Sequence, residues 1–485
     1  MIVLGAGGAG KSLLIRAITE TFQHFDALNQ LAKCATTGIA AADIGGKTMH
    51  SLFGIGRGAV KEDWISNASQ KSQEKRRKNL EGKDFVIIDE ISMADKATFC
   101  TASQALAHVR GQNGTEDVHA PFGGAHIILF GDFHQFPPVG NRTGALYRDS
   151  TNDTMQAKMG QAIFRQFDTI VILEKQMRVR DQIWVDLLSR LRTGDCTTQD
   201  IEEIEKLRID NTSLQTDFSK PPWNEAILIT PRHSVRRRWN EEAIKRHCAS
   251  SGQRRYIVTA EDTLRNSNET LPMGARLAIA KLKNEKKGKL TDTTTLAIGM
   301  KAMVILNIAT EADIANGTRG TIVDIVLDPR ETHPPIDHDG TVRLKYPPAA
   351  ILFKPDAPSN INFKGQLGGL SVEEGVVPIV PSTAPFTVHT NGKSYEVRRR
   401  QLAITAGYAF TDYKSQGQTI EYVIIDLAPP PTGGTSAFST YVALSRSRGR
   451  DRIRILGEYD VDTFLHHPSE DLRKEMDRLQ TLSNK

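Results

Sequence analysis

The sequence predicts an α/β protein with parallel, doubly wound sheets and a small inserted β-barrel. Three observations support this prediction. A glycine-rich loop joins an apolar strand to a helix within residues 2–25. Apolar runs that end in polar residues recur at 85–93 and 127–139, as is typical of strands buried on both faces of a parallel sheet. Several short strands separated by glycine and proline turns follow residue 291, and this pattern indicates a barrel.

The length and composition are those of an ordinary globular protein. The chain has 485 residues, enough for about three domains. It is 39% hydrophobic and 25% charged, and its net charge of only +5 means that any nucleic-acid binding depends on local basic patches. No stretch approaches the ~18 apolar residues of a membrane span. The cysteines are scattered, which favours reduced core thiols of an intracellular protein: Cys34, Cys100, Cys196 and Cys248.

The first dozen residues contain the most specific motif. Gly5-Ala6-Gly7-Gly8-Ala9-Gly10-Lys11-Ser12 has the spacing G-x-x-x-x-G-K-S/T, with an apolar strand before it and helical spacing after it. Glycines allow the backbone to curl tightly around phosphates, and the helix N-terminus adds free N–H groups and partial positive charge. We therefore predict a nucleotide site in which Lys11 reaches the β- and γ-phosphates and Ser12 ligates Mg²⁺.

Two further apolar runs deliver polar side chains at their ends. The first ends in Asp89 and Glu90, and either these are surface acids or they serve the nucleotide. If they serve the nucleotide, Asp89 holds Mg²⁺ directly or through water, and Glu90 polarises the attacking water. The second run is followed by Gln135, which is suited to sensing the γ-phosphate or orienting the water. His134 has the same possible role, or is an ordinary loop histidine.

Small and hydroxyl-bearing residues lie between these runs. Thr37 and Gly38 come after a strand, and Thr48 and His50 come at the start of a helix. Such residues at the edge of a sheet can contact a phosphate backbone. A tight turn and a helix cap explain them equally well. The sequence alone therefore leaves a nucleic-acid contact and a structural role equally open.

Taken in order, the motifs resemble those of superfamily 1 DNA helicases, most closely the Pif-type, RecD-like branch. The matching pieces are GAGGAGKS, CATTGIAA, KTMHSLFGIG, VIIDEISM, PFGG and LFGDFHQFPPV, then YKSQGQT and YVALSRSR. The resemblance covers nearly the whole chain and implies two RecA-like P-loop NTPase domains facing each other across ATP. In two places the sequence departs from the family: Tyr413 stands where a histidine is usual, and the adenine-recognising segment expected before the phosphate loop is absent.

The resemblance also implies roles for residues of the second domain. Gln176 and Arg178 would face the nucleotide, with an interdomain ion pair as the alternative for Arg178. Arg446 is the expected arginine finger, and Gly417 would lie beside the nucleotide. The expected catalytic set is Glu90, Gln135, Arg178 and Arg446. The expected DNA contacts are Thr37, Gly38, Thr48, His50, Lys414, Ser415 and Gln416.

These motifs suggest a division of the chain into domains. The expected ranges are a first RecA-like domain at 1–168 with a basic excursion at 57–83, a second at 169–290 and 403–485, and a barrel at 291–402. Asn391-Gly392 predicts a hairpin within the barrel. The arginines Arg398, Arg399 and Arg400 at its exit either meet a phosphate backbone or are solvated.

The expected activity is ATP hydrolysis coupled to 5′-to-3′ translocation on single-stranded DNA and duplex unwinding, with ATP and Mg²⁺ as cofactors. Expected partners are single-stranded and tailed or forked duplex DNA, with no membrane, and the protein would act as a monomer. Such a helicase would serve DNA repair, recombination or telomere maintenance, in the nucleus or the mitochondrion of a eukaryote. Two alternatives remain open: a clamp or remodeller that moves without separating strands, and a truncated or transposon-derived relative that binds single strands without productive unwinding.

Overall fold

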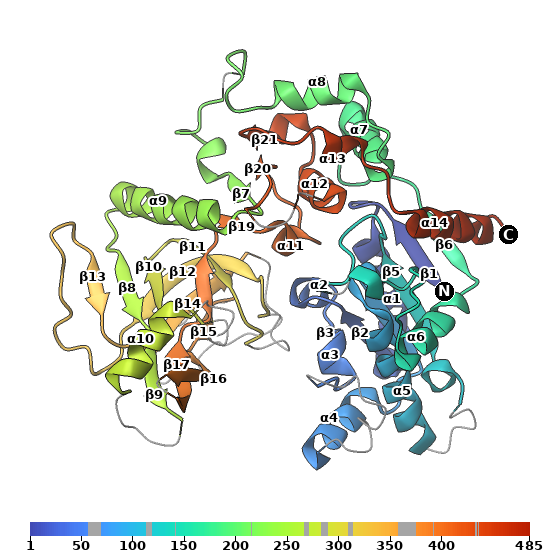
Figure 1. Ribbon diagram of the computed structural model, residues 1–485, viewed down its shortest axis with the longest axis horizontal. Coiled ribbons are helices and arrows are strands. Elements are labelled where there is room, and N and C mark those ends of the chain that lie inside the picture. Colours follow the sequence, from blue (N-terminus) through green and yellow to red (C-terminus); the bar gives the residue numbers. More distant parts are fainter. Residues whose placement is uncertain are drawn as a thin grey trace. The chain divides into compact units, whose positions relative to one another are not determined.

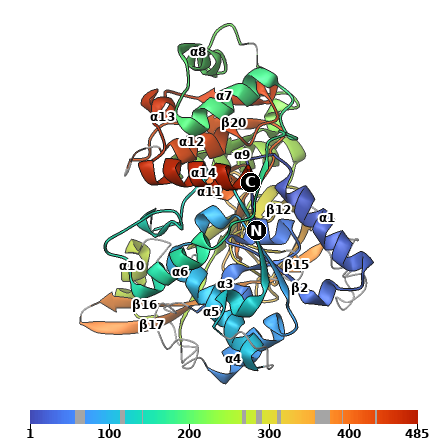
Figure 2. The ribbon, with the colours of Figure 1, turned by 90° about the vertical axis from the view of Figure 1, so that its right-hand side faces the viewer.

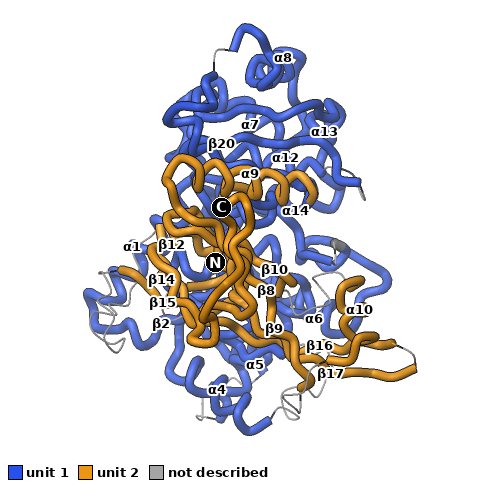
Figure 3. The backbone as a smooth tube through the Cα atoms, turned by 90° about the vertical axis from the view of Figure 1, so that its left-hand side faces the viewer, with its two compact units in different colours: residues 1–233, 410–485 blue, residues 234–409 orange. Residues whose placement is uncertain are grey.

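The structure is a computed structural model that describes residues 1–56, 69–112, 119–140, 142–214, 216–265, 271–282, 290–308, 314–356, 375–390, 392–431, 434 and 436–485. The first part of the basic excursion, 57–68, and Asn391 lie outside this set. The chain forms two compact units, coloured separately in Figure 3. Unit 1 comprises residues 1–233 and 410–485, and unit 2 comprises 234–409.

Unit 1 contains a six-stranded sheet in the order β3-β2-β4-β5-β1-β6, and its neighbouring strands are parallel (Figure 1). This confirms the predicted α/β class with parallel sheets. The strands are β1 (Ile2–Gly5), β2 (Leu31–Ala35), β3 (Lys47–Thr48), β4 (Phe85–Asp89), β5 (His126–Gly131) and β6 (Ile170–Leu173). Because the strands are parallel, the loops after β1, β4 and β5 leave the same edge of the sheet.

Both faces of this sheet are covered by helices, which explains its unbroken apolar runs. Successive residues of a strand face opposite sides, so Val3 packs with Ile15, whereas Ile2 and Leu4 pack with Phe99. The first face is covered by α1 (Lys11–His24) and α2 (Gly38–Asp43). The second is covered by α3 (Met49–Leu52), α4 (Gln70–Leu80), α5 (Lys96–Gln112), α6 (Met155–Arg165) and α14 (Glu470–Ser483). Figure 2 shows α1 and α5 on opposite sides of the sheet.

A second sheet in unit 1 contains β7 (Ile227–Ile229), β20 (Val423–Asp426) and β21 (Ile453–Leu456), which pair in parallel. The short β19 (Ala409–Phe410) lies next to β7. The segments before, between and after the strands of this second sheet form five helices: α7 (Gln182–Thr193), α8 (Thr198–Lys206), α11 (Asp412–Ser415), α12 (Ala437–Leu444) and α13 (Asp462–Leu465). No helix among the described residues is both long and apolar enough to cross a membrane.

The strand pairings bear on the expected domain limits, although the full division stays a prediction. The strand β6 falls in the range expected for the second domain, yet it pairs with β1 and extends the first sheet. In unit 2, β8 (Tyr256–Thr259) pairs with β10 (Thr293–Leu296), and β9 (Glu261–Leu264) pairs with β17 (Lys393–Gln401). Both β8 and β9 precede residue 291, so the strands of unit 2 begin earlier than the expected barrel.

Unit 2 is mostly β-structure. Its five-stranded sheet has the order β15-β14-β12-β11-β18. The strands of this sheet are β11 (Lys301–Val304), β12 (Arg319–Val326), β14 (Ala350–Pro355), β15 (Val377–Ile379) and β18 (Ile404–Ala406). The unit also contains α9 (His233–Ser251), α10 (Met273–Lys281), β13 (Val342–Leu344) and β16 (Ser382–Thr390). As far as the described residues show, this sheet ends at β15 and β18, and no closed barrel is found. The predicted hairpin is confirmed, because β16 and β17 pair along their whole length around Gly392.

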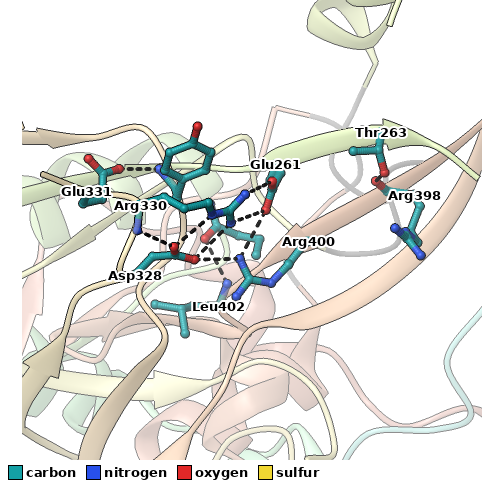
Figure 4. A network of polar contacts seen from close by, with 10 residues as sticks. Glu261, Thr263, Asp328, Arg330, Glu331, Arg398, Arg400 and Leu402 are labelled. Atoms are coloured by element: carbon teal, nitrogen blue, oxygen red, sulfur yellow. Dashed lines mark hydrogen bonds and ion pairs between the residues drawn. The ribbon is translucent and has the colours of Figure 1, made fainter. Parts of the chain in front are cut away.

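The arginines at the end of this hairpin have distinct surroundings, two of which are visible in Figure 4. Arg399 is buried, and its guanidinium lies 2.6 Å from Asp262 and 2.7 Å from Asp292. Arg400 lies 3.2 Å from Glu261 in a network that also holds Asp328 and Arg330. Arg398 is exposed and stands apart from this network. Nearby carboxylates thus form ion pairs with two of the three arginines. This leaves Arg398 as the candidate for a phosphate contact.

Candidate nucleotide site

The phosphate loop runs from β1 into α1, and its conformation requires glycine. Gly8 and Gly10 have φ angles of +92° and +95°, in the left-handed region that side chains disfavour. A Cβ atom on Gly7 would lie 3.2 Å from the Arg446 guanidinium, and one on Gly8 would lie 2.4 Å from Gln176. Gly5 packs closely against Ala9. Close neighbours therefore restrict Gly5, Gly7 and Gly8, and the backbone conformation restricts Gly8 and Gly10.

Lys11 is the first residue of α1 and is buried within the loop. Its ammonium group donates hydrogen bonds to the Gly5 carbonyl at 2.7 Å and the Ala6 carbonyl at 3.2 Å. Ser12 follows it in the first turn of the helix. The positive charge therefore lies inside the curl of the backbone, which is the position that binding of phosphates requires.

The acidic pair lies at the end of β4. Asp89 is the last residue of the strand, and Glu90 adopts a left-handed conformation with φ of +53°. The Glu90 N–H donates to the Asp89 carboxylate at 2.8 Å, and both side chains are buried. Burial, and then the Glu90 charge, raise the pKa of Asp89 to about 7, while the Lys11 charge opposes this shift. A bound divalent cation would favour the ionised carboxylate.

Gln135 lies in the loop after β5, beside Asp132. Its amide nitrogen donates to the Asp132 carboxylate at 3.3 Å. Its amide oxygen is buried and has no hydrogen-bond partner among the residues that the structure describes. A Cβ atom on Gly7 would lie 3.6 Å from the Gln135 nitrogen, so this side chain reaches the phosphate loop. His134 packs instead against Asp132 and Arg192.

Gln176 and Arg178 follow β6, the strand next to β1, and this neighbourhood brings them to the phosphate loop. The Gln176 amide donates to the Gly7 carbonyl at 3.0 Å, and the Met177 N–H donates to the Gly8 carbonyl at 2.9 Å. The Arg178 guanidinium donates to the Ser445 carbonyl at 3.0 Å. Among the described residues no carboxylate lies within ion-pair distance of Arg178, which disfavours the ion-pair alternative.

Arg446 follows α12 and is only 1% exposed. Its guanidinium donates to four acceptors: the carbonyls of Val442, Ser415 and Gln418 at 2.7, 3.3 and 3.1 Å, and the Ser445 hydroxyl at 2.6 Å. The described residues offer it no carboxylate partner. Burial, and then the charge of Arg178, lower the pKa of Arg446 to about 9, so it stays protonated at neutral pH. A buried cation without a counter-ion, close to Gly7, is suited to an anionic ligand.

The segment 414–417 lies closer to the acids than expected. The Gln416 amide donates to the Glu90 carboxylate at 3.0 Å, and a Cβ atom on Gly417 would lie 3.9 Å from the same carboxylate. Ser415 is fully buried, and its hydroxyl donates to the Asp412 carbonyl at 2.6 Å. The side chains of Ser415 and Gln416 are buried, and their predicted contacts with DNA stay predictions. Lys414 is half-buried, and its DNA contact stays a prediction.

The residue that departs from the family motif makes a contact of its own. The ring of Tyr413 stacks on that of Phe136, with centroids 4.0 Å apart and planes inclined by 19°. Phe136 is buried in the loop after β5, and Tyr413 is 40% exposed. The aromatic side chain thus connects α11 to the loop that carries Gln135.

The other predicted DNA contacts lie on a different part of unit 1. The Thr37 hydroxyl caps α2 by accepting from the Ala40 N–H at 3.3 Å, and Thr48 caps α3 by accepting from the Ser51 N–H at the same distance. Both threonines therefore have the structural role, helix capping, that is the alternative to a contact with DNA. Gly38 begins α2, and His50 is exposed. Their contacts with DNA stay predictions.

The sequence interpretation missed three residues that complete the site. Tyr441 accepts a hydrogen bond from the Gly7 N–H at 3.2 Å and donates to Asp132 at 3.2 Å. Arg192 donates to the same carboxylate at 2.8 Å. Tyr441 and Asp132 belong to recognised motifs, but spacing does not reveal which way a side chain points. Arg192 lies on α7, where it looks like an ordinary helix arginine.

Comparisons with known proteins find similar sequences. Residues 1–201 match the family model described as PIF1-like helicase. The chain is 26% identical over 463 residues to the ATP-dependent DNA helicase PIF7 of Trypanosoma brucei brucei, covering 92% of this chain and 43% of that protein. It is 27% identical over 459 residues to the ATP-dependent DNA helicase Pif1 of Bdellovibrio bacteriovorus, covering 94% of this chain and 84% of that protein.

The fold also has a solved counterpart. A crystal structure of the Pif1 helicase from Bacteroides, in complex with ADP-AlF3 and ssDNA, superposes with a TM-score of 0.66. The match covers 99% of this chain and 93% of that one at 20% sequence identity, and shows that the two share a fold. The family model covers the phosphate loop and the motifs of Glu90 and Gln135, and both relatives align with more than nine-tenths of the chain, so the chain is similar to PIF1-like helicases over nearly its whole length.

Proposed function

We propose that the chain is an ATP-dependent DNA helicase that couples ATP hydrolysis to movement on single-stranded DNA and to duplex unwinding. The observation that carries the proposal is the gathering of Lys11, Gln135, Arg178 and Arg446 at one phosphate loop. Glu90 is held by Gln416, in the segment whose carbonyls Arg446 also contacts. Both relatives are named ATP-dependent DNA helicases, and the Bacteroides counterpart holds ADP-AlF3 and ssDNA. Function inside the nucleus or mitochondrion, if the source is eukaryotic, is part of the same proposal, as are roles in DNA repair, recombination and telomere maintenance.

Different residues of the chain bind the phosphates, hold the metal ion and activate the attacking water. The loop amides and Lys11 bind the phosphates, and the Ser12 hydroxyl and Asp89 carboxylate are the oxygen ligands that would hold Mg²⁺. No cluster of three or more metal-binding side chains is present in the described ranges, which suits an ion held largely by the nucleotide's phosphates and water. The ion would neutralise charge on the phosphates. Glu90 accepts the proton of the attacking water, and Gln135 orients that water.

Glu90→Gln should bind ATP but hydrolyse it about 10²–10⁴ times more slowly than the wild type. The amide keeps the shape of the side chain and can present its oxygen to the Gln416 amide, which donates to Glu90 at 3.0 Å. It cannot accept the proton of the water. Steady-state phosphate release, measured beside equilibrium binding of a fluorescent ATP analogue, tests this. An unchanged rate would show that the base lies elsewhere.

DNA affinity should fall steeply as salt rises, because it rests on contacts with phosphates. Polythymidine and mixed-sequence single strands should bind within a few-fold of each other, since stacking and backbone contacts do not read bases. Fluorescence anisotropy at several salt concentrations measures both. A strong sequence preference would instead indicate a site-specific DNA-binding protein.

Two assays on the purified chain test the whole proposal. Single-stranded DNA should stimulate ATP hydrolysis, and a partial duplex with a 5′ tail should be unwound in preference to one with a 3′ tail. Absence of hydrolysis with DNA binding intact would support the alternative of an inactive relative. Stimulated hydrolysis without strand separation on either tail would support the clamp or remodeller.

A further inference from the structure

Tyr441 lies on α12 and contacts the phosphate loop directly. Its side chain is 2% exposed. The Gly7 N–H donates a hydrogen bond to the phenol oxygen at 3.2 Å, and the phenol O–H donates in turn to Oδ2 of Asp132 at 3.2 Å. Tyr441 therefore bridges the loop after β1 and the loop after β5.

The bond to Tyr441 occupies one main-chain donor of the phosphate loop, the Gly7 N–H. Main-chain N–H groups of such a loop are the donors that hold phosphate oxygens. Hydrogen bonds weaken steeply as they depart from a straight line, so one N–H cannot serve a phosphate oxygen and the phenol oxygen equally well. A phosphate oxygen that accepted from the Gly7 N–H would therefore compete with Tyr441 for it.

Asp132 connects Tyr441 to the residue expected to sense the γ-phosphate. Oδ2 of Asp132 accepts from Tyr441 and also from the Gln135 amide at 3.3 Å. Oδ1 accepts from Arg192 at 2.8 Å. Burial alone would raise the pKa of Asp132, but Arg192 and His134 lower it well below its usual value. The carboxylate stays ionised, so a Tyr441 side chain that left Asp132 as well as Gly7 would free an acceptor site on the atom that holds Gln135.

The helix α12 connects Tyr441 to Arg446. The Ser445 N–H donates to the main-chain carbonyl of Tyr441 at 2.9 Å, and the Ser445 hydroxyl accepts from the Arg446 guanidinium at 2.6 Å. Arg446 also donates to the carbonyl of Val442, the residue after Tyr441. A shift of Tyr441 that moves this last turn would therefore reposition the buried arginine.

Tyr441 also has space into which it can move. A cavity of about 310 Å³ lies beside its ring and is lined by His134, Arg192, Phe438 and His466, among others. This space, which Tyr441 itself lines, is where a displaced phenol would move.

We propose that Tyr441 is a positioning residue that competes with the nucleotide's phosphates for the Gly7 N–H and passes its displacement on to Gln135 and Arg446. The inference rests on the proposed function, because it requires that the loop holds ATP. It also predicts a sign: removing the phenol oxygen removes a competitor, so nucleotide binds more tightly. If the bond only stabilised the loop, its removal would weaken binding.

The test is Tyr441→Phe, which keeps the ring and deletes the competing oxygen. The dissociation constant for ADP, measured with a fluorescent analogue, should fall about two- to tenfold, the worth of one neutral hydrogen bond. The DNA-stimulated kcat should fall several-fold, because Gln135 and Arg446 no longer receive the displacement. The matched control is Tyr147→Phe, since Tyr147 lines the same cavity without contacting the loop, and its ADP affinity should equal that of the wild type.

Three outcomes would overturn the inference. An unchanged or weakened ADP affinity in Tyr441→Phe, with the wild type binding normally, would refute it and leave the proposed function standing. Equal tightening in Tyr147→Phe would assign the effect to the cavity rather than to the Gly7 bond. If the wild-type chain binds no nucleotide, the proposed function is refuted, and the inference, which rests on it, is refuted as well.

Discussion

Replacing Lys11 by alanine is expected to abolish ATP hydrolysis. The ammonium group is buried in the curl of the phosphate loop, 2.7 Å from the Gly5 carbonyl and 3.2 Å from the Ala6 carbonyl. A phosphate in the loop would receive this charge directly, and the need for it is greatest when charge shifts in the transition state. Phosphate release with and without single-stranded DNA should fall to background.

The matched control is Lys158→Ala, which removes an exposed lysine from α6 and should leave the rate unchanged. DNA binding without nucleotide should survive in both variants, because the predicted strand contacts do not include Lys11. Thermal unfolding should show that Lys11→Ala is folded. Near wild-type hydrolysis by this variant would mean that the loop does not hold the reacting phosphates.

The sequence predicted those parts of the site that local motifs encode. The loop after β1, the acids after β4 and Gln135 after β5 each follow an unbroken apolar run, and parallel strands deliver their ends to one edge. No pairing had to be known for this. The glycine spacing and the polar residues after each run were sufficient.

What the sequence could not predict depends on pairing and side-chain direction. The strand β6 pairs with β1, and β8 and β9 pair with strands far along the chain, so local sequence patterns alone do not show which strands share a sheet. Gln416 faces Glu90 and is buried, although its motif suggested DNA. Asp132 gathers Tyr441, Arg192 and Gln135 from separate segments, an arrangement that exists only in the folded protein.

The buried arginine supports the second large prediction. Arg446 and Lys11 are far apart in the sequence, yet Gly7 approaches Arg446 so closely that a Cβ atom there would lie 3.2 Å from the guanidinium. Arg446 has no carboxylate partner among the described residues, so its charge is available to a transferring phosphoryl group. Arginine fingers of this kind are worth about 10³–10⁵ in rate. The same guanidinium also holds the carbonyls of Val442, Ser415 and Gln418, so its removal has a structural cost as well.

Two neighbouring variants separate the chemical role from this structural one. Arg446→Lys keeps a positive charge and loses the planar fork, and it should recover part of the stability lost in Arg446→Ala but little of the rate. Arg448→Ala is the matched control, because Arg448 lies two residues further on, is exposed, and lies 3.6 Å from Glu421. An exposed pair of this kind is worth at most ~1 kcal/mol, so Arg448→Ala should change kcat by no more than a few-fold.

Arg446→Ala should therefore bind ATP nearly normally, lose DNA-stimulated hydrolysis by about 10³–10⁵ and fail to translocate. Arg446 is hydrogen-bonded to α12 and to the 415–418 segment. The residue that stabilises the phosphoryl group can therefore transmit the loss of that group to the part of unit 1 that contains the second sheet. Measuring kcat with and without single-stranded DNA, beside ATP affinity and thermal unfolding, distinguishes the possibilities. A loss of only a few-fold with stimulation intact would make the finger role untenable. A large loss of rate with ATP affinity and folding preserved would place the chemistry and its coupling to DNA on this one side chain.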